Sequence, residues 1–195
     1  MMGRVARHRR LMKIGRQLLE ELGEDPAREG LRETPDRWAR MWLEFVDFDA
    51  GNTGTVFRAE GTDQMVVVGG IRVWSMCEHH LLPFYCDVAI GYIAGNRILG
   101  LSKFARIAQA HAHKLQVQER LVEAIATEVR EVTEATDVAV LAVGELLCMV
   151  MRGARTPHRM VSSALHGQFR QDMGARSEFY TLAKLGGLGD LGPVR

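Results

Sequence analysis

The sequence predicts a domain of the α+β class that is built on an antiparallel sheet. Two observations predict this class. Apolar residues recur at helical spacing in the first fifty residues, whereas several stretches between residues 65 and 169 are rich in valine and isoleucine, as strands are. The predicted strands are separated by one pair of helices and do not alternate with single helices, which favours antiparallel pairing. The 195 residues are enough to bury one sizeable core.

The N-terminal segment is expected to form two helices. Leucine and isoleucine recur at helical spacing over residues 11–22, after a basic lead-in at residues 1–10 that we expect to be frayed or weakly helical. Gly23 is a suitable C-terminal stop. The second helix begins at Thr34-Pro35, where threonine can cap the helix and proline suits its first position. The aromatic stripe that follows is explained by packing.

Strand patterns dominate the centre of the chain. Residues 65–74 predict a strand with a kink at a Gly-Gly pair, and residues 86–93 predict the next strand. Gly95-Asn96 is a hairpin signal that would pair this strand with residues 97–99.

The pair of helices and the last strands are predicted in the second half of the chain. Ser102 is expected to cap a helix, and a longer helix follows at residues 117–132. Further strands are predicted at 137–145, continuing through Cys148 to Arg152, and at 159–169, before a last helix at 175–185. The resulting organisation is an N-terminal helical segment (1–48), a main domain (49–185) and a flexible glycine-rich tail (186–195).

Composition excludes several functions. The net charge is +1, so no overall electrostatic attraction favours nucleic acid or an anionic membrane. No apolar run reaches the roughly 20 residues that span a bilayer. Three cysteines without an export signal indicate a reducing cytoplasm, and metal or thiol chemistry in place of disulfides.

The segment Cys77-Glu78-His79-His80 carries the strongest chemical signal. The C-x-x-H spacing lets Cys77 and His80 reach the same metal ion, and an apolar frame surrounds the four polar residues. His79 is then a candidate general acid or base beside the metal, although a surface imidazole is the ordinary alternative.

A catalytic zinc site usually has a third protein ligand, and two further cysteines are available. Cys86 follows the motif closely but could be an inert buried residue. Cys148 lies in a predicted strand from which an inward thiol could face the motif, so spacing favours Cys148 and leaves Cys86 open.

A second group of residues is suited to bind an anion and a nucleobase. Ser102, Lys103 and Arg106 lie in the first turn of a predicted helix, where the helix dipole favours anions, although a solvated basic face is an equal alternative. Glu119, next to Gln118, could accept two N–H donors from a guanine edge, although capping is the usual role of such residues.

These motifs together resemble GTP cyclohydrolase I from about Leu18 to Leu185. The matching segments are 23–26, 28–31, 33–37, 75–84, 91–93, 99–106, 115–121, 148–153 and 176–179. The resemblance implies the tunnelling fold, an antiparallel sheet with helices on one face, assembled into a ring-shaped homodecamer with sites shared between subunits. It implies zinc-dependent hydrolysis of GTP at purine C8, which yields 7,8-dihydroneopterin triphosphate and formate.

The resemblance also implies a role for each site residue. The zinc ligands would be Cys77, His80 and Cys148, which removes Cys86 from consideration. His79 would act as acid and base at the purine, with Ser102 beside the ribose. Guanine would be held by Gln118 and Glu119, and the triphosphate by Arg37, Lys103, Arg106 and Arg152.

One position departs from the family pattern. A second catalytic histidine usually stands two residues before the last cysteine, where this chain has Leu146. Leucine transfers no protons. Besides the complete reaction, two alternative functions therefore remain open. The enzyme could stop at the ring-opened formamidopyrimidine nucleotide or use another purine nucleotide, or the protein could be a catalytically silent nucleotide-binding oligomer.

Overall fold

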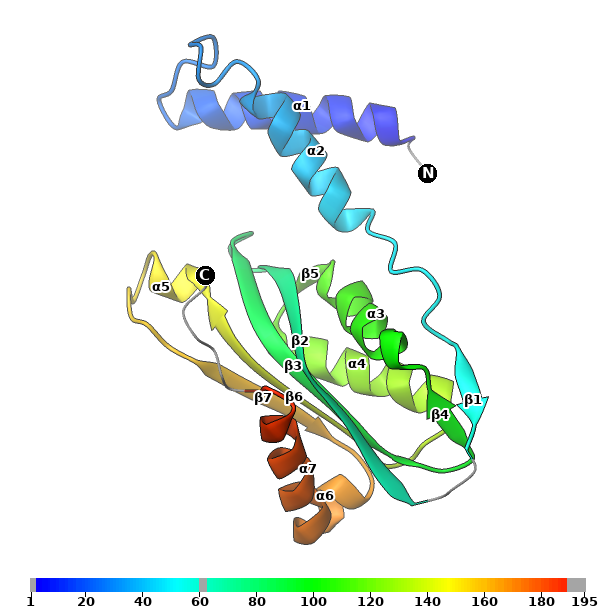
Figure 1. The fold of residues 1–195 in the computed structure, drawn as a ribbon. Coiled ribbons are helices and arrows are strands. Elements are labelled where there is room, and N and C mark those ends of the chain that lie inside the picture. Colours follow the sequence, from blue (N-terminus) through cyan, green and yellow to red (C-terminus); the bar gives the residue numbers. More distant parts are fainter. Residues whose placement is uncertain (1–2, 60–62, 189–195) are drawn as a thin grey trace. The chain divides into compact units, whose positions relative to one another are not determined.

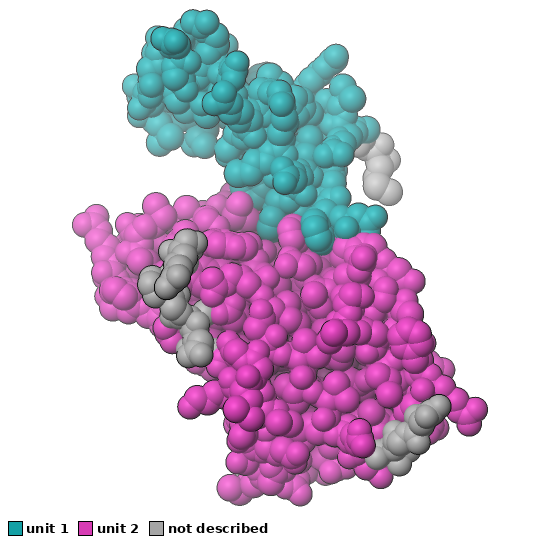
Figure 2. Space-filling view, viewed as in Figure 1, with its two compact units in different colours: residues 1–49 teal, residues 50–195 magenta. Residues whose placement is uncertain are grey.

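The computed structural model describes residues 3–59 and 63–188. The chain divides into two compact units, residues 1–49 and 50–195, which Figure 2 shows in different colours. Part of the expected tail, residues 189–195, lies outside the described residues.

The first unit consists of α1 (Arg4–Glu21) and α2 (Thr34–Val46). The lead-in that was expected to be frayed or weakly helical is part of α1 from Arg4 onward, and Arg7 Nη1 donates a 2.7 Å hydrogen bond to Asp47 Oδ1. Gly23 has a φ of 79° directly after the first helix, as a C-terminal stop requires. Thr34 is the first helical residue and does not cap the helix.

The second unit is built on a sheet with the strand order β5-β2-β3-β6-β7 among the described residues. Its strands are β2 (Gln64–Cys77), β3 (Pro83–Ala94), β5 (Leu115–Gln116), β6 (Val138–Leu146) and β7 (Met160–Leu165). All neighbours are antiparallel except β5, which pairs in parallel with the end of β2. The predicted α+β class with an antiparallel sheet is confirmed.

The predicted kink in β2 is confirmed, but the prediction that β3 forms a hairpin with residues 97–99 is wrong. The register between β2 and β3 shifts between Val68 and Ile71, where Gly70 has a φ of 67°. β4 (Arg97–Leu99) does not pair with β3 and instead forms a small antiparallel sheet with β1 (Val56–Arg58). A local turn signal identified the bend, whereas the pairing partner came from 40 residues earlier in the chain.

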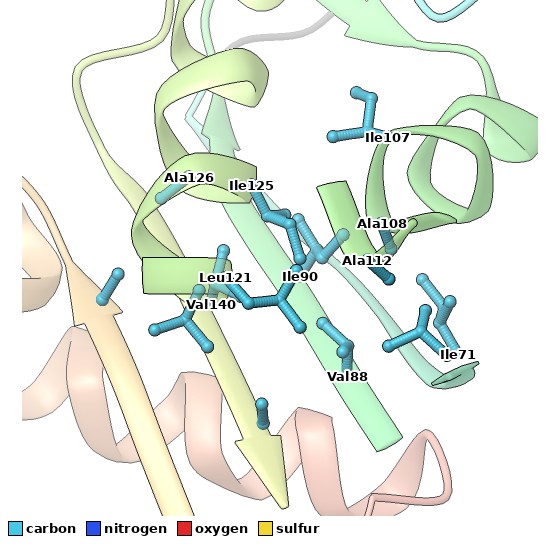
Figure 3. Packing of buried hydrophobic residues seen from close by; sticks show 14 of the residues in the cluster. Ile71, Val88, Ile90, Ile107, Ala108, Ala112, Leu121, Ile125, Ala126 and Val140 are labelled. Carbon is cyan, nitrogen blue, oxygen red and sulfur yellow. The ribbon is translucent and has the colours of Figure 1, made fainter. Parts of the chain in front are cut away.

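Helices cover both faces of the main sheet (Figure 1). α3 (Leu101–Ala112) and α4 (Gln118–Thr133) cover one face, and Figure 3 shows Leu121 and Ile125 of α4 beside Ile90 and Val140 of the sheet. The short α6 (Gln168–Gln171) and α7 (Met173–Leu185) pack on the opposite face around Phe169 and Phe179. The expectation of helices on one face therefore describes α3 and α4, and α7 adds a second, smaller core.

The predicted strand from Leu146 to Arg152 is wrong. β6 ends at Leu146, and residues Leu147–Val150 form a helical turn, α5, with the Met151 N–H donating to Leu147 O. The register of β6 with its two neighbouring strands explains why the strand does not continue. The pairing of β6 with β7 stops at Gly144 and its pairing with β3 stops at Leu146, so no strand is available to bond the following backbone.

Candidate metal centre and substrate site

The ends of β2 and β6, which lie on either side of β3 in the sheet, bring the three predicted metal ligands together. Cys77 is the last residue of β2, and a tight turn follows in which Leu81 N–H donates to Cys77 O and Leu81 has a φ of 53°. This turn carries His80. Cys148 is contributed by a separate segment, the α5 turn that follows β6.

The distances fit one shared ion. Cys77 Sγ lies 3.8 Å from His80 Nδ1 and 4.0 Å from Cys148 Sγ, and the three ligand atoms lie within 4.8 Å of one another. Two thiolates on a tetrahedral zinc ion, each at about 2.3 Å from it, would be about 3.8 Å apart. Cys77 and Cys148 are buried whereas His80 is exposed, so the group is open on the imidazole side.

A cation at this group would act on the ionisation of the Cys148 thiol. Burial, together with neighbouring Cys77, raises the pKa of the Cys148 thiol, and the positive charge of Arg152 opposes this only partly. A divalent cation between the two sulfurs favours their ionised form. The thiolate and imidazole donor set therefore suits zinc.

Cys86 does not belong to this group. Its side chain is fully buried in the main core, and burial raises the pKa of its thiol to about 12. Among the described residues, the group that could hold a metal ion consists of Cys77, His80 and Cys148. Cys86 is accordingly a small apolar core residue, which was the alternative left open by its spacing.

The two remaining residues of the motif face outward. His79 is exposed, and its Nε2 lies 3.9 Å from Glu78 Oε1. Glu78 Oε2 accepts a hydrogen bond from Arg120 Nη2, which lies 2.5 Å away and belongs to the first turn of α4. This hydrogen bond holds the pKa of the Glu78 carboxyl below its ordinary value.

The basic helix start is present, with one correction. Gly100 precedes α3, so Ser102 lies inside the first turn and does not cap it. Lys103 Nζ donates to Asn52 O at 2.8 Å and Arg106 Nη1 donates to Ala50 O at 2.6 Å. Both cations therefore point toward the same segment, and an anion that binds them must compete with two backbone carbonyls.

The two residues predicted to hold guanine differ in exposure. Glu119 is exposed in the first turn of α4. Gln118 is completely buried, and its Nε2 donates to Ala142 O and Met160 O, so the structure does not bring its side chain to a ligand-accessible surface.

The last two predicted cations are exposed. Arg152 lies just after the α5 turn, close enough to Cys148 to affect its pKa. The predicted strand from Leu146 through Cys148 to Arg152 is absent here, because Leu147–Val150 form a helical turn. Arg37 belongs to the first unit, where its Nη2 contacts Glu33 Oε2 at 2.5 Å.

Leu146 ends β6 opposite Phe84 and packs against the core cluster that contains Cys77 and Cys148. An apolar side chain therefore stands where the family pattern places an imidazole. Sequence reasoning assigned no role to Arg120, although its place directly after Glu119 at a helix start was a usable signal.

An α+β domain with a Cys-His-Cys metal group, an adjacent histidine and a basic helix start has the components of a metal-dependent enzyme for an anionic substrate. The family model described as GTP cyclohydrolase I matches residues 12–184. The chain belongs to the GTP cyclohydrolase I family. Within residues 3–59 and 63–188, no helix has the length and apolar character needed to cross a membrane.

Curated relatives agree with this assignment. GTP cyclohydrolase 1 of Aquifex aeolicus is 47% identical over 170 residues, which cover 87% of this chain and 92% of the relative. The enzyme of Hyperthermus butylicus is 42% identical, covering 89% of both chains, and that of Deinococcus radiodurans is 46% identical, covering 87% of this chain and 81% of the relative.

Proposed function

We propose that this protein hydrolyses GTP at purine C8 and converts it to 7,8-dihydroneopterin triphosphate and formate. The observation that carries the proposal is the convergence of Cys77, His80 and Cys148 within 4.8 Å in a chain of this family. Zn²⁺ held by these residues would supply Lewis-acid activation of water at neutral pH.

The residues around the metal group have distinct proposed tasks. His79 is exposed beside the ligands and exchanges protons with the purine as general acid and base. The carboxylate of Glu119 accepts the N–H donors of the guanine edge. Gln118 serves this site indirectly, because its buried amide fixes the start of the helix that presents Glu119.

The triphosphate is bound by two cations of α3, together with two further arginines. Lys103 and Arg106 exchange their carbonyl partners for phosphate oxygens, and a charge-assisted bond to phosphate is stronger than a bond to a neutral carbonyl. Ser102 lies beside the ribose. Arg152 and Arg37 complete the set in a ring-shaped homo-oligomer, a decamer by family expectation, whose sites are shared between subunits.

A second product is favoured by one specific observation. Leu146 packs against the cluster that holds two metal ligands and offers no proton there. Attack at C8 and opening of the imidazole ring need the metal and His79, whereas formate loss and ring closure need further proton transfers. The ring-opened formamidopyrimidine nucleotide is therefore the alternative product, from GTP or from another purine nucleotide.

Incubation of the zinc-loaded protein with GTP tests the proposal. Formate release together with the mass of dihydroneopterin triphosphate is the expected result. A ring-opened product without formate would establish the alternative. Unchanged GTP that nevertheless binds would show a silent nucleotide-binding oligomer.

Arg106→Ala should weaken GTP binding by about 10- to 100-fold and leave guanosine binding nearly unchanged. The reason is that a charged hydrogen bond contributes about 1.5–3 kcal/mol, and guanosine has no phosphate to receive it. Calorimetric titration of both ligands checks this, with Arg130→Ala as a control at the far end of α4. An equal loss for GTP and guanosine would place Arg106 outside the phosphate site.

A further inference from the structure

Glu78 and Arg120 form an ion pair that the assigned tasks leave without a function. Glu78 lies between the metal ligands Cys77 and His80, whereas Arg120 lies in the first turn of α4. The Arg120 Nη2 to Glu78 Oε2 distance is 2.5 Å. The pair therefore links the turn that carries the metal ligands to the helix start that carries Glu119.

The backbone supports the same link. Glu78 N–H donates to Gln116 O at 3.1 Å, and Cys77 pairs with Gln116 where β5 joins β2. The metal-binding turn is thus tied to the segment before α4 by its backbone and to α4 itself by a side chain.

The helix end of the link is rigid. Gln118 has no exposed surface, and its Nε2 donates to Ala142 O of β6 at 3.1 Å and to Met160 O of β7 at 3.0 Å. The first turn of α4 is thereby fixed to two strands. Arg120, two residues further on, reaches the metal-binding turn from a fixed point.

The other end of the link reaches the proposed acid and base. The second oxygen of Glu78, Oε1, lies 3.9 Å from His79 Nε2. The Glu78 carboxylate thus contacts the guanidinium of Arg120 and lies near the imidazole of His79. Because His79 directly follows Glu78 in the same turn, a displacement of Glu78 would displace His79.

We propose that Arg120 is a positioning residue whose ion pair with Glu78 sets His79 and the metal ligands at a defined distance from Glu119. This rests on the proposed function, in which Glu119 holds the base while His79 acts on it. In this arrangement Arg120 contacts neither metal nor substrate. Such geometry matters because a misplacement of about 1 Å can reduce a reaction rate by about 100-fold.

The pair is partly exposed, with 31% of the Glu78 side chain and 52% of the Arg120 side chain accessible to solvent. Exposed ion pairs contribute little to folding stability. Removal of the pair should therefore leave the thermal unfolding temperature nearly unchanged, so effects on the site can be separated from effects on the fold.

The test compares Arg120→Gln, Glu78→Gln and the double variant with Arg97→Gln. Arg97 forms a matched exposed pair with Glu134, with an Nη2 to Oε1 distance of 2.9 Å, away from the metal group. Each protein is loaded with Co²⁺, and the thiolate-to-cobalt absorption, the cobalt affinity, and kcat and KM for GTP are measured.

We expect both single variants to alter the cobalt spectrum, to weaken cobalt binding by about tenfold and to lower kcat by a similar factor. The double variant should be no worse than either single variant, because the same contact is lost in all three. Arg120→Lys should recover part of the loss, whereas Arg97→Gln should resemble the unaltered protein throughout.

The proposal is overturned if Arg120→Gln gives the same cobalt spectrum, cobalt affinity and kcat as Arg97→Gln. It is also overturned if the effects of Arg120→Gln and Glu78→Gln simply add. The cobalt measurements need no turnover, so they decide the role of the pair even if the unaltered protein releases no formate from GTP, a result that would count against the proposed function alone.

Discussion

Replacing Cys148 with alanine is expected to lower zinc affinity and formate release by at least about 100-fold. The change removes one of the two sulfurs of the metal group and leaves Cys77 and His80 as donors. Loss of a residue that merely supports a metal ligand typically costs 10–100-fold, so loss of a ligand should cost more. Zinc content after dialysis and formate release by the same sample measure the two effects.

Cys86→Ala is the matched control for this prediction. Cys86 is also a fully buried cysteine of the same core, but it lies outside the metal group. This variant should lose some stability through the small cavity and retain its zinc. If Cys86→Ala lost zinc while Cys148→Ala kept it, the assignment of the third ligand would be wrong.

Leu146→His is expected to raise the rate of formate release by about 10² to 10⁴, the usual contribution of one general acid or base. Leu146 ends β6 opposite Phe84, beside the cluster that contains Cys77 and Cys148. An imidazole at this position could take part in the proton transfers that follow ring opening. The ratio of formate to ring-opened product, followed by mass spectrometry in single-turnover reactions, should rise with it.

Leu146→Gln separates proton transfer from polarity in this experiment. Glutamine has nearly the volume of leucine and forms hydrogen bonds, but it does not titrate. It should therefore give no gain. A stable, zinc-loaded Leu146→His variant without faster formate release would mean that another group already supplies the protons.

Several elements could be predicted from the sequence because their signals are local. The Gly-Gly kink in β2 and the glycine stop after α1 each depend on a backbone conformation that glycine adopts easily. The antiparallel sheet followed from the grouping of valine-rich and isoleucine-rich stretches.

The errors share a physical cause, which is that pairing partners lie far apart in the chain. The turn at Gly95-Asn96 exists, but β4 pairs with β1. The apolar segment after Leu146 has strand-like composition, yet it forms a helical turn because its neighbours on both sides have ended. Strand preference depends on a partner, and composition cannot supply one.

The sequence by itself determined which residues can bind a metal. Cys77 and His80 are close because they are three positions apart in one turn, and Cys148, which spacing favoured over Cys86, was selected by the family resemblance. The tertiary structure decided the remainder. It brought Cys148 to within 4.0 Å of Cys77, it buried Cys86 and Gln118, and it joined Arg120 to the metal-binding turn. These arrangements depend on strand register and helix docking across about 40 to 70 residues, which the spacing of residues along the chain does not encode.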